Sequence, residues 1–334
     1  MLLRTVGRIC GALIASSIVW APTARAADFT MKLGFVTIND QNQQWANWYK
    51  EAVEKGSNGR IEVQIYPASQ LGPVPRQIEG IQLGTIEAVL LPADFFVGLD
   101  PRYGIFSIPS LFRDMKNAAA AIADPALNKE ILALGESKGM IGITAFVYSA
   151  ADYFAKDPIR RLDDFKGKKF RINATPAERE RMRVLGATAV PMPTHEVVPA
   201  LQRGAIDGTQ SAIAVFVNFK YIDLGKVLTQ TDDTMLVPIA VVSKPWLEKL
   251  PAELQKLVVE EGRKLQSGVQ ARSFEVVDEM RKKWTGAGGE IVTLQPADQA
   301  RLTELLKPVG PEVTKSSPPL NAFYDRVKSV ADKN

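Results

Sequence analysis

The feature that most constrains the fold is a strand, helix, strand, helix pattern between residues 162 and 213. Two short apolar runs with β-type residues, at 169–172 and 187–190, predict strands. The residues between them, 176–185, predict a helix that Gly186 can close. A second helix is predicted from about Thr194 to Gly204. The whole unit reads as βαβα and is typical of an α/β layer.

Arg171 stands at the exit of the first strand of this unit. In open α/β sheets, ligands bind at the exit ends of the strands. A guanidinium group can pair with both oxygens of a carboxylate, whereas a lysine offers only a point charge. The position therefore predicts an anion site. The alternative is that Arg171 only continues the solvated basic patch of Lys166, Lys168 and Lys169.

The preceding part of the chain shows the same alternation. Strands are predicted at residues 29–36, 61–66 and 88–91, and helices at 41–55 and 76–83. This spacing favours parallel sheets with helical crossovers, and therefore a second α/β layer. If the two sheets oppose each other, the strand exits at residues 37–45 and 92–96 face the same cleft as Arg171.

Two apolar runs, at residues 141–148 and 234–243, are expected to carry the chain between the two layers. Domain I would then comprise residues 27–148 and 237–276, and domain II residues 149–236 and 277–334. A helix from about residue 250 to Trp284 would be about 45 Å long and would lie across both domains. The tail from Pro296 predicts two more helices, separated at residues 316–319.

The first 26 residues have the pattern of a signal peptide. Arg4 and Arg8 precede an apolar run at residues 9–20, and small residues at 24–26 predict cleavage before Ala27. A retained membrane anchor is the alternative. Cys10 lies inside this segment, so the processed chain contains no cysteine. A secreted protein without disulfides must depend on a large apolar core, which more than 300 residues can supply.

The charge balance argues against nucleic acid as a partner. Removing Arg4, Arg8 and Arg25 from the 41 basic residues leaves 38 against 37 acidic residues, a net charge of +1. The processed chain has no run of basic residues interleaved with aromatic residues. Both observations disfavour the electrostatic surface that a DNA-binding or RNA-binding protein needs.

Residues for catalysis and metal binding are scarce. The chain has one histidine, His195, and G-x-S-x-G, Walker A and G-x-G-x-x-G motifs are absent. We therefore expect no enzymatic activity, no cofactor and no metal site built on His or Cys. An oxygen-ligated calcium or sodium site stays open, because it leaves no spacing signature. The acidic pairs at 163–164 and 232–233 are interpreted as solvated loop residues.

Several motifs resemble one protein family along nearly the whole processed chain. They are DDFKGKKFRI at residues 163–172, LGATAVPMPTHEVVPALQRGAIDG at 185–208, NGR at 58–60, SQLG at 69–72, IQLGTI at 81–86 and LPAEL at 250–254. This pattern is similar to the solute-binding proteins of tripartite ATP-independent periplasmic (TRAP) transporters, DctP type. The resemblance implies a type II-like, two-lobed periplasmic binding protein fold. It also implies a periplasmic, monomeric receptor that delivers a small organic acid to membrane permease subunits.

The resemblance, together with the strand exits, suggests a set of ligand-binding residues. Arg171 would hold the carboxylate, while Asn173, Gln210 and Ser211 would contact polar groups of the ligand. The cleft walls would include three aromatic residues, Trp45, Phe96 and Tyr148. Many family members carry a further arginine where this chain has Ser-Ala-Ala-Asp at 149–152. A single arginine favours a ligand with one carboxylate. The tryptophan predicted in the cleft favours a ligand that also carries an aromatic ring or hydroxyl groups.

Two other functions remain open from the sequence. A periplasmic hydrolase or isomerase would use the same cleft, although only carboxylates without a recognisable pairing are available as acid or base. A receptor for another transporter class, such as an ATP-driven one, would share the same features. The identity of the acid does not follow from the sequence.

Overall fold

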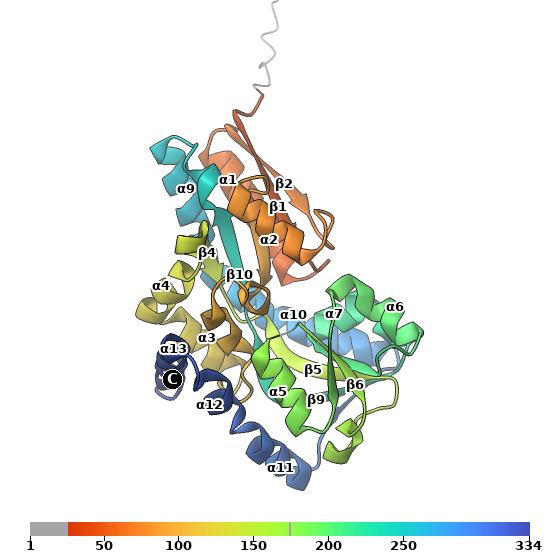
Figure 1. Cartoon of the computed structure of the whole chain (residues 1–334). Helices are drawn as coiled ribbons and strands as arrows, with labels where there is room; N and C mark the ends of the chain where they lie inside the picture. Colours follow the sequence, from red (N-terminus) through yellow and green to blue (C-terminus); the bar gives the residue numbers. More distant parts are fainter. Residues whose placement is uncertain (1–25, 174) are drawn as a thin grey trace, which may run out of the picture.

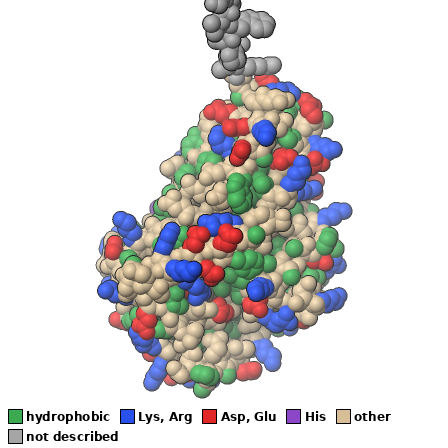
Figure 2. All heavy atoms as spheres, turned by 180° about the vertical axis from the view of Figure 1, so that it is seen from behind, with side chains coloured by type: hydrophobic (Ala, Val, Ile, Leu, Met, Phe, Trp, Pro, Cys, Tyr) green, Lys and Arg blue, Asp and Glu red, His purple; other side chains and the backbone are tan. Residues whose placement is uncertain are grey.

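The computed structural model describes residues 26–173 and 175–334, and these residues form two lobes, each built around a β-sheet (Figure 1). Most of the predicted signal peptide, residues 1–25, therefore lies outside the described residues. The α/β fold class with two lobes is confirmed. On the face seen in Figure 2, basic and acidic side chains are interspersed.

The sheet of the first lobe has the strand order β2-β1-β3-β10-β4. Its strands are β1 (Phe29–Phe35), β2 (Ile61–Tyr66), β3 (Ala88–Pro92), β4 (Met140–Ala145) and β10 (Pro238–Ser243). The strands β1, β2 and β3 pair in parallel, whereas β10 runs antiparallel to both β3 and β4. The sheet is therefore mixed, because its strand β10 enters from the other lobe.

Helices of the first lobe begin and end where local chemistry favours it. They are α1 (Gln41–Gly56), α2 (Val74–Leu83), α3 (Met115–Ala123), α4 (Pro125–Ala133), α8 (Lys244–Leu247) and α9 (Ala252–Lys264). Asp40 caps α1 by accepting a hydrogen bond from the Gln43 backbone N–H. Gly84 ends α2 in the left-handed conformation, at φ 74°. Asp124 ends α3 and caps α4, which begins at Pro125.

The sheet of the second lobe has the order β11-β9-β5-β8-β6-β7. Its strands are β5 (Ser149–Ala155), β6 (Lys169–Ile172), β7 (Thr188–Pro191), β8 (Gly208–Ser211), β9 (Val227–Leu236) and β11 (Glu290–Thr293). The predicted βαβα unit is present as β6, α5 (Pro176–Val184), β7 and α6 (Val197–Gln202), with β6 and β7 parallel. Helix α7 (Ile213–Asn218) follows β8 directly.

The predicted crossings between the lobes differ from the structure in one respect. The predicted strand 141–148 ends early, as β4, and β5 of the other sheet begins just after it, whereas the predicted strand 234–243 is divided between the end of β9 and β10. Leu236 and Val237 therefore lie at the second crossing. The crossings are hydrogen-bonded to each other, because the Tyr148 N–H donates to the Leu236 carbonyl at 2.8 Å.

The long C-terminal helix is present with a short interruption. Helix α9 ends at Lys264, Leu265 forms a turn, and α10 (Gln266–Gly286) continues from it. Helix α9 packs on β4 and α1 of the first lobe, while α10 also contacts α7 and β5 of the second. The tail contains three helices instead of the two predicted, α11 (Pro296–Leu306), α12 (Val309–Thr314) and α13 (Pro318–Ala331).

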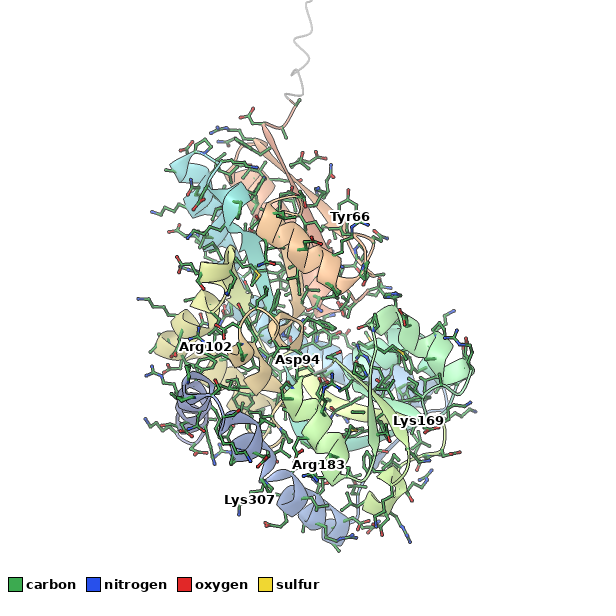
Figure 3. All side chains as sticks on the ribbon, viewed as in Figure 1. Tyr66, Asp94, Arg102, Lys169, Arg183 and Lys307 are labelled. Atoms are coloured by element: carbon green, nitrogen blue, oxygen red, sulfur yellow. The ribbon has the colours of Figure 1, made fainter. Side chains whose placement is uncertain are left out.

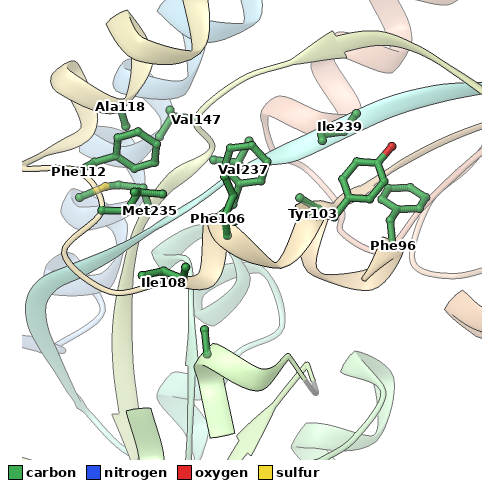
Figure 4. Close-up of a cluster of buried hydrophobic side chains, with 14 of the residues drawn as sticks. Phe96, Tyr103, Phe106, Ile108, Phe112, Ala118, Val147, Met235, Val237 and Ile239 are labelled. Atoms are coloured by element: carbon green, nitrogen blue, oxygen red, sulfur yellow. The ribbon is translucent and has the colours of Figure 1, made fainter. Parts of the chain in front are cut away.

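Buried apolar side chains form a core that continues from one lobe to the other. In Figure 4, side chains of the 3-10 segment η2 (Pro101–Ser107), among them Tyr103 and Phe106, lie beside Val237 and Ile239 of the second crossing. The same cluster of buried residues includes Phe170 of β6. The residues around the crossings are thus held by continuous packing.

Candidate functional site

A cavity lies between the lobes, and its lining comes from both of them and from the crossings. The first lobe contributes Val36, Thr37, Asn42, Pro92 and Phe95; the crossings contribute Tyr148, Leu236 and Pro238; the second lobe contributes Arg171, Asn173, Thr194, Gln210, Ser211, Ala212 and Val215. The exits of β1 and β3 in one lobe and of β6 and β8 in the other therefore meet at one place, as strand order in α/β layers favours.

Arg171 is the only lysine or arginine in this lining. Its side chain is held by two neutral groups: Nε donates to the Met192 carbonyl at 2.9 Å, and Nη2 donates to Thr194 Oγ1 at 3.2 Å. The residue is only 6% exposed. Burial lowers the pKa of Arg171, yet a guanidinium group remains protonated at neutral pH. Within the described part of the chain, no carboxylate forms an ion pair with it.

Asn173 follows β6 and connects the two lobes. Its Nδ2 donates to Asp94 Oδ2 at 3.2 Å, and Asp94 belongs to the 3-10 turn η1 (Ala93–Phe96) after β3. Figure 3 shows Asp94 between the upper and the lower lobe. Burial, together with the charge of Glu178, raises the pKa of Asp94 to about 7. The hydrogen bond thus joins the lobes through a carboxyl group that is buried beside the cavity.

Gln210 and Ser211 lie at the end of β8 and both line the cavity. Gln210 Nε2 donates to Asp233 Oδ1 at 3.0 Å, and the Tyr153 hydroxyl donates to Asp233 Oδ2 at 3.1 Å. The interpretation of residues 232–233 as a solvated loop is therefore wrong for Asp233. This residue is 5% exposed and lies within β9, where it accepts hydrogen bonds from side chains on β5 and β8.

Tyr148 lies at the first crossing and is fixed to the first lobe. Its hydroxyl donates to Asp40 Oδ2 at 2.5 Å, and its carbonyl accepts from Gln41 Nε2 at 2.7 Å. Asn42, one position further along α1, donates from Nδ2 to Thr37 Oγ1 at 3.0 Å. The N-terminal turn of α1 therefore positions one wall of the cavity.

Two of the seven predicted ligand-binding residues do not line the cavity. Trp45 is fully buried and stacks on Tyr49, with ring centroids 4.8 Å apart. These two residues are one turn apart on the buried side of α1, whereas Asn42 lies one turn before Trp45 and reaches the cavity. The prediction that Trp45 forms a cleft wall is wrong.

Phe96 is also fully buried. Its ring packs beside Tyr103, with centroids 5.2 Å apart, in the cluster seen in Figure 4. Neighbouring residues of the 3-10 turn η1 point in different directions, so Phe95 lines the cavity and Phe96 enters the core. The prediction for Phe96 is wrong by one residue.

The structure adds residues that the sequence did not suggest. Thr37, Asn42, Phe95 and Thr194 line the cavity. Thr37 and Asn42 fall within the strand exit at residues 37–45, which the sequence placed at the cleft without selecting them. His195, by contrast, has a side chain that is 52% exposed and lies outside this lining.

Arg181 on α5 is a second buried arginine of the same lobe. It is 1% exposed, and its Nη1 donates to Thr234 Oγ1 at 2.5 Å. Burial lowers the pKa of Arg181, but the acidic groups around it, including Asp233 and Glu178, outweigh this effect and raise it. Its side chain does not line the cavity, and it therefore belongs to the structure beneath the site.

Comparison with known proteins identifies the family. The model of bacterial extracellular solute-binding proteins, family 7 (DctP), matches residues 36–316. The chain belongs to this family. Family membership confirms the resemblance on which the sequence interpretation drew, and with it a periplasmic solute-binding protein. Among the described residues, no helix has the length and apolar character needed to cross a membrane.

Relatives of this family 7 protein include receptors with different named solutes. The C4-dicarboxylate-binding periplasmic protein DctP of Rhodobacter capsulatus is 29% identical over 253 residues, covering 74% of this chain and 76% of its own. The 2,3-diketo-L-gulonate-binding periplasmic protein YiaO of Escherichia coli is 26% identical over 317 residues, covering 89% and 96%.

Solved structures show the same fold. A TRAP periplasmic solute-binding protein from Xanthobacter autotrophicus Py2 with bound β-D-galacturonate superimposes with a TM-score of 0.83 at 26% identity, covering 90% of this chain and 99% of its own. The sugar acid-binding protein DctPAm from Advenella mimigardefordensis, in complex with galactonate, has a TM-score of 0.87 at 20% identity, covering 92% and 99%. The two-lobed fold is therefore that of TRAP solute-binding proteins.

Proposed function

We propose that this protein captures a small organic acid between its lobes and delivers it to the permease subunits of a TRAP transporter. The observation that carries the proposal is Arg171, a buried cation that lines the interlobe cavity and has no carboxylate partner among the described residues. A carboxylate of the ligand would supply the missing counter-charge. The relatives named above support this choice, because their named solutes are all carboxylic acids.

Four further residues would contact the ligand. Asn173, Gln210 and Ser211 present polar side chains to the cavity, and Tyr148 presents its ring at the crossing. The two segments of each lobe, 27–148 with 237–276 and 149–236 with 277–334, would close on the ligand by bending at the two crossings. We expect a monomer that acts without a cofactor and returns the bound acid chemically unchanged.

Replacement of Arg171 tests the proposal. Arg171→Ala should weaken binding of an acid found by thermal-shift screening at least about 30-fold, a loss of about 2 kcal/mol, because the charge of the ligand would be buried without a partner. Isothermal titration calorimetry measures the change. Arg179→Ala removes an exposed arginine from α5 of the same lobe and should bind like the unmodified protein.

Two results would count against the receptor. An unchanged Kd for Arg171→Ala would remove the proposed carboxylate anchor. Conversion of a bound acid into a product, followed by nuclear magnetic resonance after incubation with purified protein, would instead favour the enzyme interpretation.

A further inference from the structure

Hydrogen bonding around the cavity restricts the chemistry of the acid, and this inference rests on the proposed function. The first restriction is charge. Arg171 is the single cationic side chain in the lining, so the cavity provides one strong site for one carboxylate. The other lining groups are neutral: polar side chains, apolar side chains and one tyrosine.

The second restriction is that three side chains of the lining each give a hydrogen bond to a carboxyl group of the protein. Asn173 Nδ2 donates to Asp94, Gln210 Nε2 donates to Asp233, and the Tyr148 hydroxyl donates to Asp40. Each of the three acceptors is a buried carboxyl group of the protein. A second carboxylate of a ligand would therefore lie near these internal acceptors, and the Tyr148 hydroxyl has no further proton to give it.

The third restriction comes from acceptors that have no partner. The amide oxygens of Asn42 and Asn173 are buried and accept no hydrogen bond from any described residue. Both side chains line the cavity, one from each lobe. A buried acceptor without a partner costs free energy, which a donor on the ligand would recover.

Neighbouring groups fix the orientation of both amides. Asn173 directs its NH2 group toward Asp94, which leaves its oxygen on the other side of the amide plane. Asn42 directs its NH2 group toward Thr37 Oγ1, which again leaves its oxygen on the other side of the amide plane. The unpaired atoms are thus acceptors in both residues.

We infer that the ligand is a hydroxylated monocarboxylate, whose carboxylate pairs with Arg171 and whose hydroxyl groups donate to the amide oxygens of Asn42 and Asn173. A dicarboxylate fits less well, because its second carboxylate would meet these acceptors and the buried Asp94, Asp233 and Asp40 behind them. An amino acid also fits less well, because no Asp or Glu lines the cavity to balance an ammonium group.

Matched acids separate these classes. A six-carbon set comprises D-gluconate, hexanoate, adipate and L-norleucine, and a three-carbon set comprises L-lactate, propionate, malonate and L-alanine. In at least one set, we expect the hydroxy acid to bind at least about tenfold more tightly than each of its three partners in calorimetric titrations.

The possible results lead to different conclusions. If the dicarboxylate, the amino acid or the unsubstituted acid binds most tightly in both sets, the hydroxy acid inference is overturned and the carboxylate receptor stands. If no acid of any class binds, the proposed function itself falls, and this inference falls with it.

Variants of the two asparagines test the mechanism. Asn173→Leu should weaken binding of the hydroxy acid at least about tenfold, but should change binding of the matched unsubstituted acid less than about twofold. Equal losses for both acids would overturn the assignment of the amide oxygen. Asn42→Leu repeats the test from the other lobe, and the exposed Asn47→Leu on the same helix is its control. Melting temperatures without ligand show whether each variant is folded.

Discussion

Arg171 and Arg181 are two buried arginines of the same lobe, ten positions apart, and they differ in their electrostatic surroundings. Arg181 lies among Asp233, Glu178 and Asp94, whose charges favour its protonated form. The charges of Glu178 and Asp94 act on Arg171 as well, but burial outweighs them there, and its hydrogen bonds go only to a carbonyl and a threonine hydroxyl. Burial alone therefore does not mark a binding residue. What distinguishes Arg171 is that its buried charge lines the cavity, since neither arginine forms an ion pair with a carboxylate of the described residues.

The largest expected effect concerns Arg181. Arg181→Met should lower the free energy of unfolding by about 3–5 kcal/mol, because it leaves the buried carboxyl groups around it without their cation. Chemical denaturation of the unliganded protein measures this change. Arg179→Met, an exposed arginine on the same helix, is the control and should change stability by less than about 0.5 kcal/mol. A loss as small as that of the control would mean that Arg181 is not the structural member of the pair.

Asp152 is a buried acidic residue of the same lobe, and its replacement should change stability by an intermediate amount. This residue is fully buried, neither carboxyl oxygen accepts a hydrogen bond from a described residue, and Arg281 Nη2 lies 3.9 Å away. Burial raises the pKa of Asp152 to about 7. Because the folded state holds this proton and the unfolded state releases it near pH 4, stability should fall as pH rises from about 4 to about 7.

Asp152→Asn should therefore raise the free energy of unfolding by about 1–2 kcal/mol at pH 8, because it removes a buried charge. The gain should shrink toward zero near pH 4, where the carboxyl group is protonated in both states. Denaturation curves at the two pH values measure the difference. A gain that does not depend on pH would contradict the titration of Asp152 in this range.

The smallest expected change in stability is that of Arg171, the arginine that lines the cavity. Arg171→Met should change the stability of the unliganded protein by less than about 1 kcal/mol. The substitution loses two hydrogen bonds, but it also removes the cost of burying a cation without an ion-pair partner, and the two effects oppose each other. The same denaturation assay applies. A loss comparable to that of Arg181→Met would show that both arginines serve the fold.

The sequence predicted the βαβα unit correctly, because its apolar runs and helix ends follow local rules. Residues 169–172 form β6, and Thr175 caps α5 with Glu178 in a capping box. Strand β9 was missed before residue 234, since residues 230–233, Gln-Thr-Asp-Asp, resemble a loop. Only the other strands of the sheet, of which β5 and β8 hydrogen-bond Asp233 through their side chains, explain why this polar segment is a strand.

The sequence could not predict which aromatic rings line the cavity, because this again depends on how the elements pack against each other. The sequence brings Trp45 and Phe96 near strand exits, but one turn of helix or one residue of a turn decides whether a ring faces the cavity or the core. The ligand-binding roles of Arg171, Asn173, Gln210, Ser211 and Tyr148 stay predictions until binding is measured. Their common position at the cavity follows from the strand order of the second sheet and the crossings.

Helix α10 holds the first crossing through hydrogen bonds to the backbone of Val147. The Gln270 side-chain amide accepts from the Val147 N–H at 2.8 Å and donates to the Val147 carbonyl at 3.2 Å. The adjacent Tyr148 N–H is bonded to Leu236 on the other crossing. The two connections therefore form a single ribbon anchored to a helical strut. We therefore expect the two connections to bend together when the lobes move, while both stay attached to α10 through Gln270.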